Sequence, residues 1–90
     1  MKKFIIERDV PGAGDLSEEE LQAISKTSNS VISVLGKPYK WVESFVTKDK
    51  IYCIHEADSE DVIRQHGNCA GFPVNGIEEV KARITPETAG

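Results

Sequence analysis

The chain has 90 residues, 39% of them hydrophobic and 29% charged, which is typical of one small folded domain and leaves no length for a second core. A formal net charge of −4 disfavours nucleic acid and anionic membranes as partners, because both attract a concentrated basic surface. No apolar segment is long enough for a signal-peptide core or a membrane span, so we expect a cytoplasmic protein.

The first part of the chain predicts a strand followed by a long helix. Residues 3–10 form an apolar and charged run that ends in a Pro/Gly-rich turn, which is typical of a strand. Ser17 and Glu20 have the spacing of a capping box, which marks the beginning of a helix. Apolar residues then recur at helical spacing until Gly36, a residue type that ends helices. We therefore predict a helix over residues 17–35.

Two runs of aromatic and β-branched residues, 39–46 and 51–57, predict a β-hairpin with its tip at Lys48 and Asp49. Residues that oppose each other across a hairpin share a face of the sheet. One face is then predicted to carry Val42, Val46, Ile51, Cys53 and His55. The other face is predicted to carry Trp41, Glu43, Phe45, Tyr52, Ile54 and Glu56.

The last part of the chain predicts a second helix and a final strand. Asp58 or Ser59 caps a helix whose apolar stripe consists of Val62, Ile63, His66 and Ala70. Residues 77–84 alternate as a strand, with Val80, Ala82 and Ile84 predicted to face inward. Residues 85–90 are expected to form a tail of the single domain 1–90.

The predicted order is strand, helix, strand, strand, helix, strand. Short connections and right-handed crossovers then favour an α+β, ferredoxin-like sandwich, in which two helices cover one face of a four-stranded antiparallel sheet. The other face, called the open sheet face below, would expose Trp41, Phe45, Tyr52 and Ile54. Such an apolar surface predicts a homodimer that forms through this face, as in dimeric α+β barrels.

Several segments resemble a known protein family. They are residues 4–13, residues 50–53, His66, and the sequence Gly71-Phe72-Pro73. Together they are similar to a family of small bacterial proteins, classed as a domain of unknown function, that includes a dimeric ferredoxin-like nickel-binding protein. The resemblance implies the same fold, a homodimer and nickel as a ligand. Cys53 and His66 match the family pattern, whereas His55 and Cys69 are particular to this chain.

Two cysteines and two histidines predict one candidate metal site. Cys53 and His55 share a strand face, while His66 and Cys69 share a helix face, so the four side chains could converge. Imidazole and thiolate ligands suit nickel or zinc. In the alternative interpretation Cys53 is a small core residue and His66 bonds a backbone carbonyl of the following turn. His55 and Cys69 then lie on the surface.

Carboxylates on the open sheet face form a second candidate site. Glu7, Glu43 and Glu56 are predicted there, with His66 at the rim, and such ligands suit nickel or another divalent cation. In the alternative interpretation Glu7 and Glu43 pair with Lys81 or Arg83 across the sheet.

The leading functional hypothesis is therefore a small homodimeric divalent-metal-binding protein that serves in sequestration or homeostasis, with nickel as first candidate. A small cofactor-free or metal-dependent enzyme and a non-catalytic interaction module are the alternatives. No organic cofactor is predicted, because the chain has no nucleophile elbow and no complete Gly-rich phosphate loop.

Overall fold

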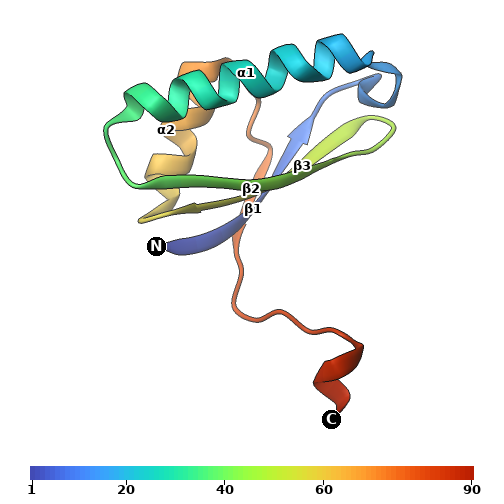
Figure 1. The fold of residues 1–90 in the computed structure, drawn as a ribbon, viewed down its shortest axis with the longest axis vertical. Coiled ribbons are helices and arrows are strands. Elements are labelled where there is room, and N and C mark those ends of the chain that lie inside the picture. Colours follow the sequence, from blue (N-terminus) through green and yellow to red (C-terminus); the bar gives the residue numbers. More distant parts are fainter.

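The structure is a computed structural model that describes residues 1–90, and it has two layers (Figure 1). Two helices lie on one face of a four-stranded antiparallel sheet whose strand order is β2-β3-β1-β4. This arrangement confirms the predicted α+β, ferredoxin-like fold. The elements are β1 (Lys2–Asp9), α1 (Glu18–Leu35), β2 (Tyr39–Val46), β3 (Lys50–Ala57), α2 (Glu60–Ala70) and β4 (Gly76–Glu79), with short 3₁₀ turns at Ala13–Asp15 and Pro86–Ala89. Neither helix has the length and apolar character needed to cross a membrane.

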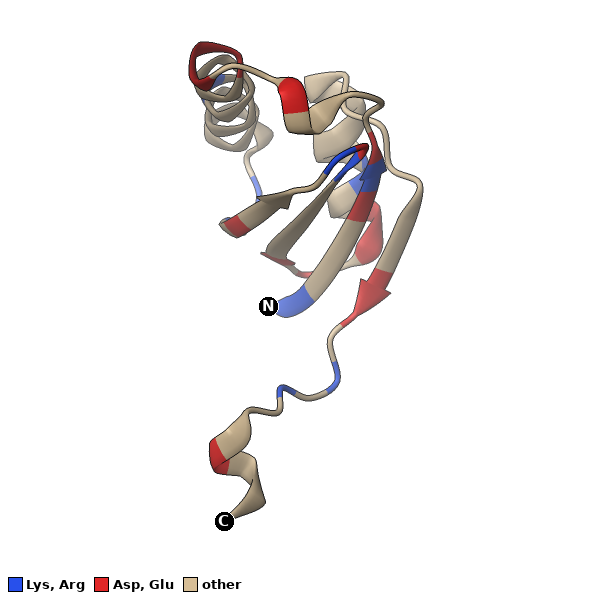
Figure 2. Cartoon of the chain, turned by 90° about the vertical axis from the view of Figure 1, so that its right-hand side faces the viewer, with Lys and Arg blue, Asp and Glu red and all other residues tan.

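The helix α1 begins at the predicted capping box. The Ser17 hydroxyl accepts a hydrogen bond from the Glu20 N–H (3.1 Å), and the Glu20 carboxylate accepts one from the Ser17 N–H (3.0 Å). Three successive glutamates (red in Figure 2) occupy its first turn, where negative charge interacts favourably with the helix dipole. The helix ends at Gly36, whose φ of 70° is accessible to glycine at little cost.

The core lies between the helices and the covered sheet face. Alternate residues of the two central strands, β1 and β3, are buried there, because successive strand residues point to opposite faces. The buried apolar residues are Phe4, Ile6, Ala13, Ile51, Cys53, Ala57, Val62 and Ile63. Three polar side chains of the same layer, Arg8, His55 and His66, are at most 3% exposed. The core is therefore unusually polar for so small a domain.

A β-bulge in β2 changes the predicted position of Trp41. Trp41 pairs with His55, whereas the next pair along the strands is Glu43 with Ile54, so Val42 is an extra residue. The extra residue turns Trp41 to the covered face, and Val42 lies with Glu43 on the other. The predictions that Trp41 lies on the open sheet face and that Val42 shares the face of His55 were both wrong, because alternation holds only for an uninterrupted strand. This face instead carries Ile5, Val42, Phe45, Tyr52 and Ile54.

The strand β4 is shorter than predicted, and the side of it that faces the core is opposite to the predicted one. Ile77 packs against the core, whereas Ile84 is 80% exposed, so the predicted inward face of residues 77–84 was wrong. The physical reason is that β1 begins at Lys2 and Glu79 already pairs with Phe4. Almost no partner strand remains for the residues that follow. They leave the domain as an extended arm (Figures 1 and 2).

Replacing Ser17 by alanine should lower the free energy of unfolding by about 1 kcal/mol, because one helical N–H loses its capping acceptor. Urea denaturation of the two proteins measures the difference. Ser30→Ala is the matched control, since Ser30 is exposed within the same helix and alanine is the better helix former there. An equal destabilisation by both substitutions would contradict the capping role.

Candidate functional site

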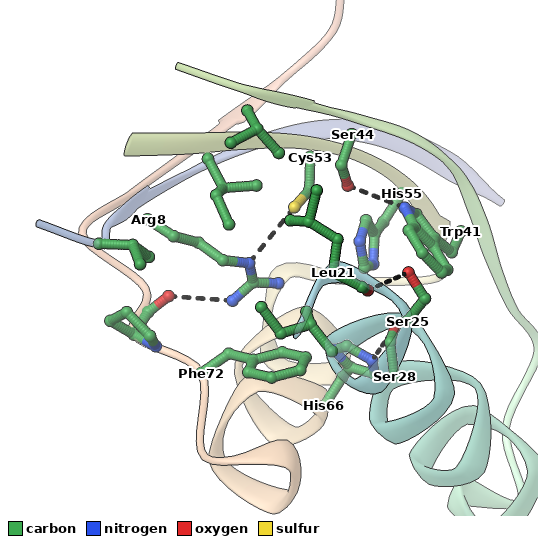
Figure 3. Close-up of a pocket in the computed structure, with 15 residues that line it drawn as sticks. Arg8, Leu21, Ser25, Ser28, Trp41, Ser44, Cys53, His55, His66 and Phe72 are labelled. Carbon is green, nitrogen blue, oxygen red and sulfur yellow. Dashed lines mark hydrogen bonds between the residues drawn. The ribbon is translucent and has the colours of Figure 1, made fainter. Parts of the chain in front are cut away.

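A cavity of about 190 Å³ lies between the covered sheet face, α1 and the turn that follows α2 (Figure 3). Its polar lining consists of Arg8, Ser25, Ser28, Ser44, Cys53, His55 and His66. The segments that carry the family resemblance meet here, since they contribute Arg8, Val10, Ile51, Cys53, His66 and Phe72 to the lining. We call this space the Arg8 cavity.

Arg8 lies across the cavity and is only 3% exposed (Figure 3). Its Nε–H donates to the Cys53 sulfur (3.4 Å), and its Nη1 donates to the backbone carbonyl of Pro73 (3.0 Å). The guanidinium carbon lies 5.5 Å from the centre of the Phe72 ring, which favours a cation. The remaining nitrogen, Nη2, is buried and has no hydrogen-bond partner.

His55 extends from β3 into the same layer and is 1% exposed. Its Nδ1 lies 2.5 Å from the Tyr39 hydroxyl. Burial raises the pKa of Tyr39 well above its usual value, so the hydroxyl keeps its proton and donates to Nδ1. The neutral His55 ring consequently carries its own proton on Nε2.

His66 extends from α2 and is completely buried. Its Nε2 lies 3.2 Å from the Ser28 hydroxyl of α1, while its Nδ1 has no partner. The ring stacks on Tyr39 at 4.9 Å and meets the ring of His55 edge-on at 5.2 Å. His66 therefore joins the two helices and the sheet, and it bonds a hydroxyl rather than the turn carbonyl considered above.

Both imidazoles are neutral at pH 7. Burial lowers the pKa of His55 to about 3, with further contributions from His66 and the Arg8 charge. Burial and the Arg8 charge also lower the pKa of His66 to about 4, against a smaller opposing effect of the Ser28 hydrogen bond. No aspartate or glutamate lines the cavity, so the Arg8 charge has no counter-ion within it.

The six residues predicted as metal ligands lie in three places. Cys53, His55 and His66 line the Arg8 cavity. Cys69 is exposed on α2 and does not line the cavity, so the predicted set of two cysteines and two histidines is not assembled. Glu7 and Glu43 lie on the open sheet face, on β1 and β2 with β3 between them. Within one chain, no group of three or more His, Cys, Asp or Glu side chains could hold a metal ion.

The charges of the open sheet face are paired differently from the alternative considered above. Glu7 accepts a hydrogen bond from Lys50 at 2.5 Å, rather than pairing with Lys81 or Arg83. This hydrogen bond raises the pKa of Lys50. Glu43 has no cationic partner within 4.0 Å and lines a groove on this face.

Sequence reasoning missed Arg8 as a site residue. A signal was present, because Arg8 continues the alternation of Phe4 and Ile6 toward the core. An arginine near the end of a strand is ordinarily solvent-exposed, so the pattern alone gave no reason to place it inside.

The fold and the cavity define a small ferredoxin-like protein with an arginine and two neutral histidines in its interior. The chain belongs to the family described as nickel responsive protein SCO4226-like, whose sequence model matches residues 4–80. The crystal structure of SCO4226 from Streptomyces coelicolor A3(2) is similar to this fold, with a TM-score of 0.75 and 16% sequence identity. The similarity covers 91% of this chain and 99% of that one. No curated protein sequence is similar enough to count as a relative.

The two buried histidines should make stability depend on pH. The unfolded chain binds a proton on each histidine near pH 6.5, whereas the folded chain does so only near pH 3 to 4. Between these values the unfolded state binds more protons, so the free energy of unfolding falls as the pH falls. The contribution of the neutral histidines to that free energy is therefore complete only above pH 6.5. The slope is at most about 1.4 kcal/mol per pH unit for each histidine. Urea denaturation between pH 5 and 7, where few carboxylates titrate, measures this slope.

Nuclear magnetic resonance gives a direct control, because the chain contains only two histidines. Neither imidazole signal of the folded protein should titrate above pH 5. A midpoint near pH 6.5 for either signal would contradict the buried, neutral state of that ring.

Proposed function

We propose that this protein is a cytoplasmic homodimer that binds a divalent metal ion, with nickel as the first candidate. The metal would lie between the two subunits. The observation that carries the proposal is its membership of a family described as nickel responsive. One chain offers no group of three ligands, which favours a metal site that takes ligands from a second copy.

The Arg8 cavity is a poor site for a cation, although neutral imidazoles are metal ligands. A dication roughly 5 Å from the guanidinium would be repelled by about 7 kcal/mol at an effective dielectric constant of about 20. No carboxylate in the lining offsets this repulsion. His55 and His66 also use one nitrogen each on Tyr39 and Ser28.

The open sheet face is the better location. It carries carboxylates, and Glu43 has no cationic partner within 4.0 Å, although Lys3 and Arg83 line the same groove. In a dimer with two-fold symmetry the same carboxylates would approach from both subunits. Carboxylate and water ligands suit nickel in an octahedral arrangement.

Exposed apolar side chains on the same face support a second copy of the chain as partner. Ile5 is 41% exposed, Val42 37% and Phe45 54%, and they lie beside the half-buried Tyr52 and Ile54. Burial of one such side chain contributes roughly 1.5–3 kcal/mol before the entropic cost of association. The C-terminal arm, residues 81–90, leaves the domain and exposes Ile84, so it could contact a partner subunit (Figure 1).

Replacing Phe45 by glutamate should weaken the dimer by at least about tenfold, because the substitution places a desolvated charge in the apolar interface. Light scattering over a concentration series measures the shift toward monomer. Val34→Glu is the matched control, since Val34 is 81% exposed on α1, away from the sheet. A wild-type protein that stays monomeric at high micromolar concentration would overturn the dimer proposal.

Glu43→Gln should lower nickel affinity by about tenfold or more, because a neutral amide replaces a charged ligand, whereas His66→Gln should leave it nearly unchanged. Calorimetric titration of tag-free protein with nickel and then zinc measures both. Phe45→Glu should also lower the affinity, because the site needs two subunits. Loss of affinity only in His66→Gln would place the metal in the Arg8 cavity, and unchanged binding in both would refute both sites.

A further inference from the structure

The protein has only two buried side-chain nitrogen or oxygen atoms without a hydrogen-bond partner. They are Nη2 of Arg8 and Nδ1 of His66. Both residues line the Arg8 cavity, although they come from β1 and α2. A buried polar atom without a partner costs roughly 1–3 kcal/mol, and more when it is charged. Two such atoms on residues that line one cavity point to a ligand, which would reach them by displacing the side chains that now cover them.

The positive charge of Arg8 indicates that the ligand is negatively charged. The Arg8 side chain is buried, and its two hydrogen bonds go to the Cys53 sulfur and the Pro73 backbone carbonyl. No carboxylate lies within 4.0 Å. A buried arginine is ordinarily paired with a carboxylate or a phosphate. The missing counter-ion is therefore an anion from outside the chain.

We propose that the Arg8 cavity binds a small organic monocarboxylate with an apolar body. The carboxylate would accept hydrogen bonds from Nη2 of Arg8 and from His66. When the Ser28 hydroxyl donates to Nε2 of His66, the single proton of this neutral ring lies on Nδ1, which is then the second donor. Ser28 and His66 lie side by side, and the Arg8 guanidinium lies on the sheet side of the cavity (Figure 3).

The size and walls of the cavity define the rest of the ligand. A volume of about 190 Å³ equals the space of about six water molecules at roughly 30 Å³ each, so a small molecule of similar size fits. The walls beyond Arg8 are mostly apolar and include Leu21, Ile24, Val46, Ile51 and Phe72. An inorganic phosphate would leave such walls uncovered and would bring more charge than one arginine neutralises. A single carboxylate on an apolar body matches both features.

The test uses metal-free, full-length protein and two pairs of isosteric probes, benzoate with benzamide and butyrate with butyramide. Ligand-observed nuclear magnetic resonance and calorimetry measure binding. At least one acid should bind, and its neutral amide should bind roughly 10- to 150-fold more weakly, which corresponds to losing a charged hydrogen bond. Binding of neither acid, equal binding of acid and amide, or displacement of the acid by equimolar inorganic phosphate would overturn the proposal.

Two variants locate the site. Arg8→Met should reduce acid binding by a similar factor and leave amide binding unchanged, because it removes the charge and keeps the volume. Lys40→Met is the matched control for lost positive charge, since Lys40 is exposed on β2, and acid binding should stay within about twofold. Acid binding that persists in a folded Arg8→Met variant would refute the site.

The stability of Arg8→Met separates a binding role from a structural one. Removing an unpaired buried charge should keep the variant at least as stable as the wild type in urea. Nickel affinity of Arg8→Met should also be unchanged, so failure of the carboxylate site and failure of the metal proposal are distinguishable.

Discussion

The Arg8 guanidinium lies at the centre of the polar interior and contacts three separate parts of the chain. It connects β1 to β3 through the Cys53 sulfur and to the turn after α2 through the Pro73 carbonyl, and it lies over the Phe72 ring. The same turn leads the chain to β4, so Arg8 contacts the segment through which the edge strand returns to the sheet. Burial keeps both neighbouring histidines neutral, and the Arg8 charge adds to this effect by lowering the pKa of each ring further. The polar interior is thus organised around one cation.

Because of the Arg8 charge, the two sheet faces favour ligands of different charge. The covered face has one buried positive charge and two neutral imidazoles, and no carboxylate lines its cavity. The open sheet face has carboxylates and exposed apolar side chains. A cation is repelled from the covered face, where no carboxylate offsets Arg8, and an anion is favoured there. The open sheet face offers carboxylates to a cation, although Lys3 and Arg83 line the same groove as Glu43. The histidine and cysteine positions that suggested a metal site in the sequence therefore lie on the face less suited to metal.

Local patterns in the sequence predicted most of the fold. The capping box, the Gly36 helix end and the alternation of β1 and β3 are properties of neighbouring residues, and each predicts a local structure on its own. The bulge at Val42 and the early end of β4 depend on how distant strands pair, which the sequence of one strand does not reveal. For the candidate site, the grouping of Cys53 with His55 was predictable from alternation. The burial of Arg8 beside Cys53 and Phe72 was not, because it depends on the packing of α2 and its following turn.

The cost of a buried, unpaired arginine is large for a domain of this size. A domain of about 90 residues has a net stability of only about 5–15 kcal/mol, and an unpaired buried charge removes several of these. An apolar residue at position 8 would avoid the cost without leaving a void, so the requirements of folding alone do not favour arginine there. Any anion that binds Arg8 would stabilise the folded state in proportion to the logarithm of its concentration, as would a partner on the open sheet face. Glu7 and Arg8 are neighbours in one strand and point to opposite faces, so both stabilising contacts would act on the same central strand, and any coupling between them would be reciprocal.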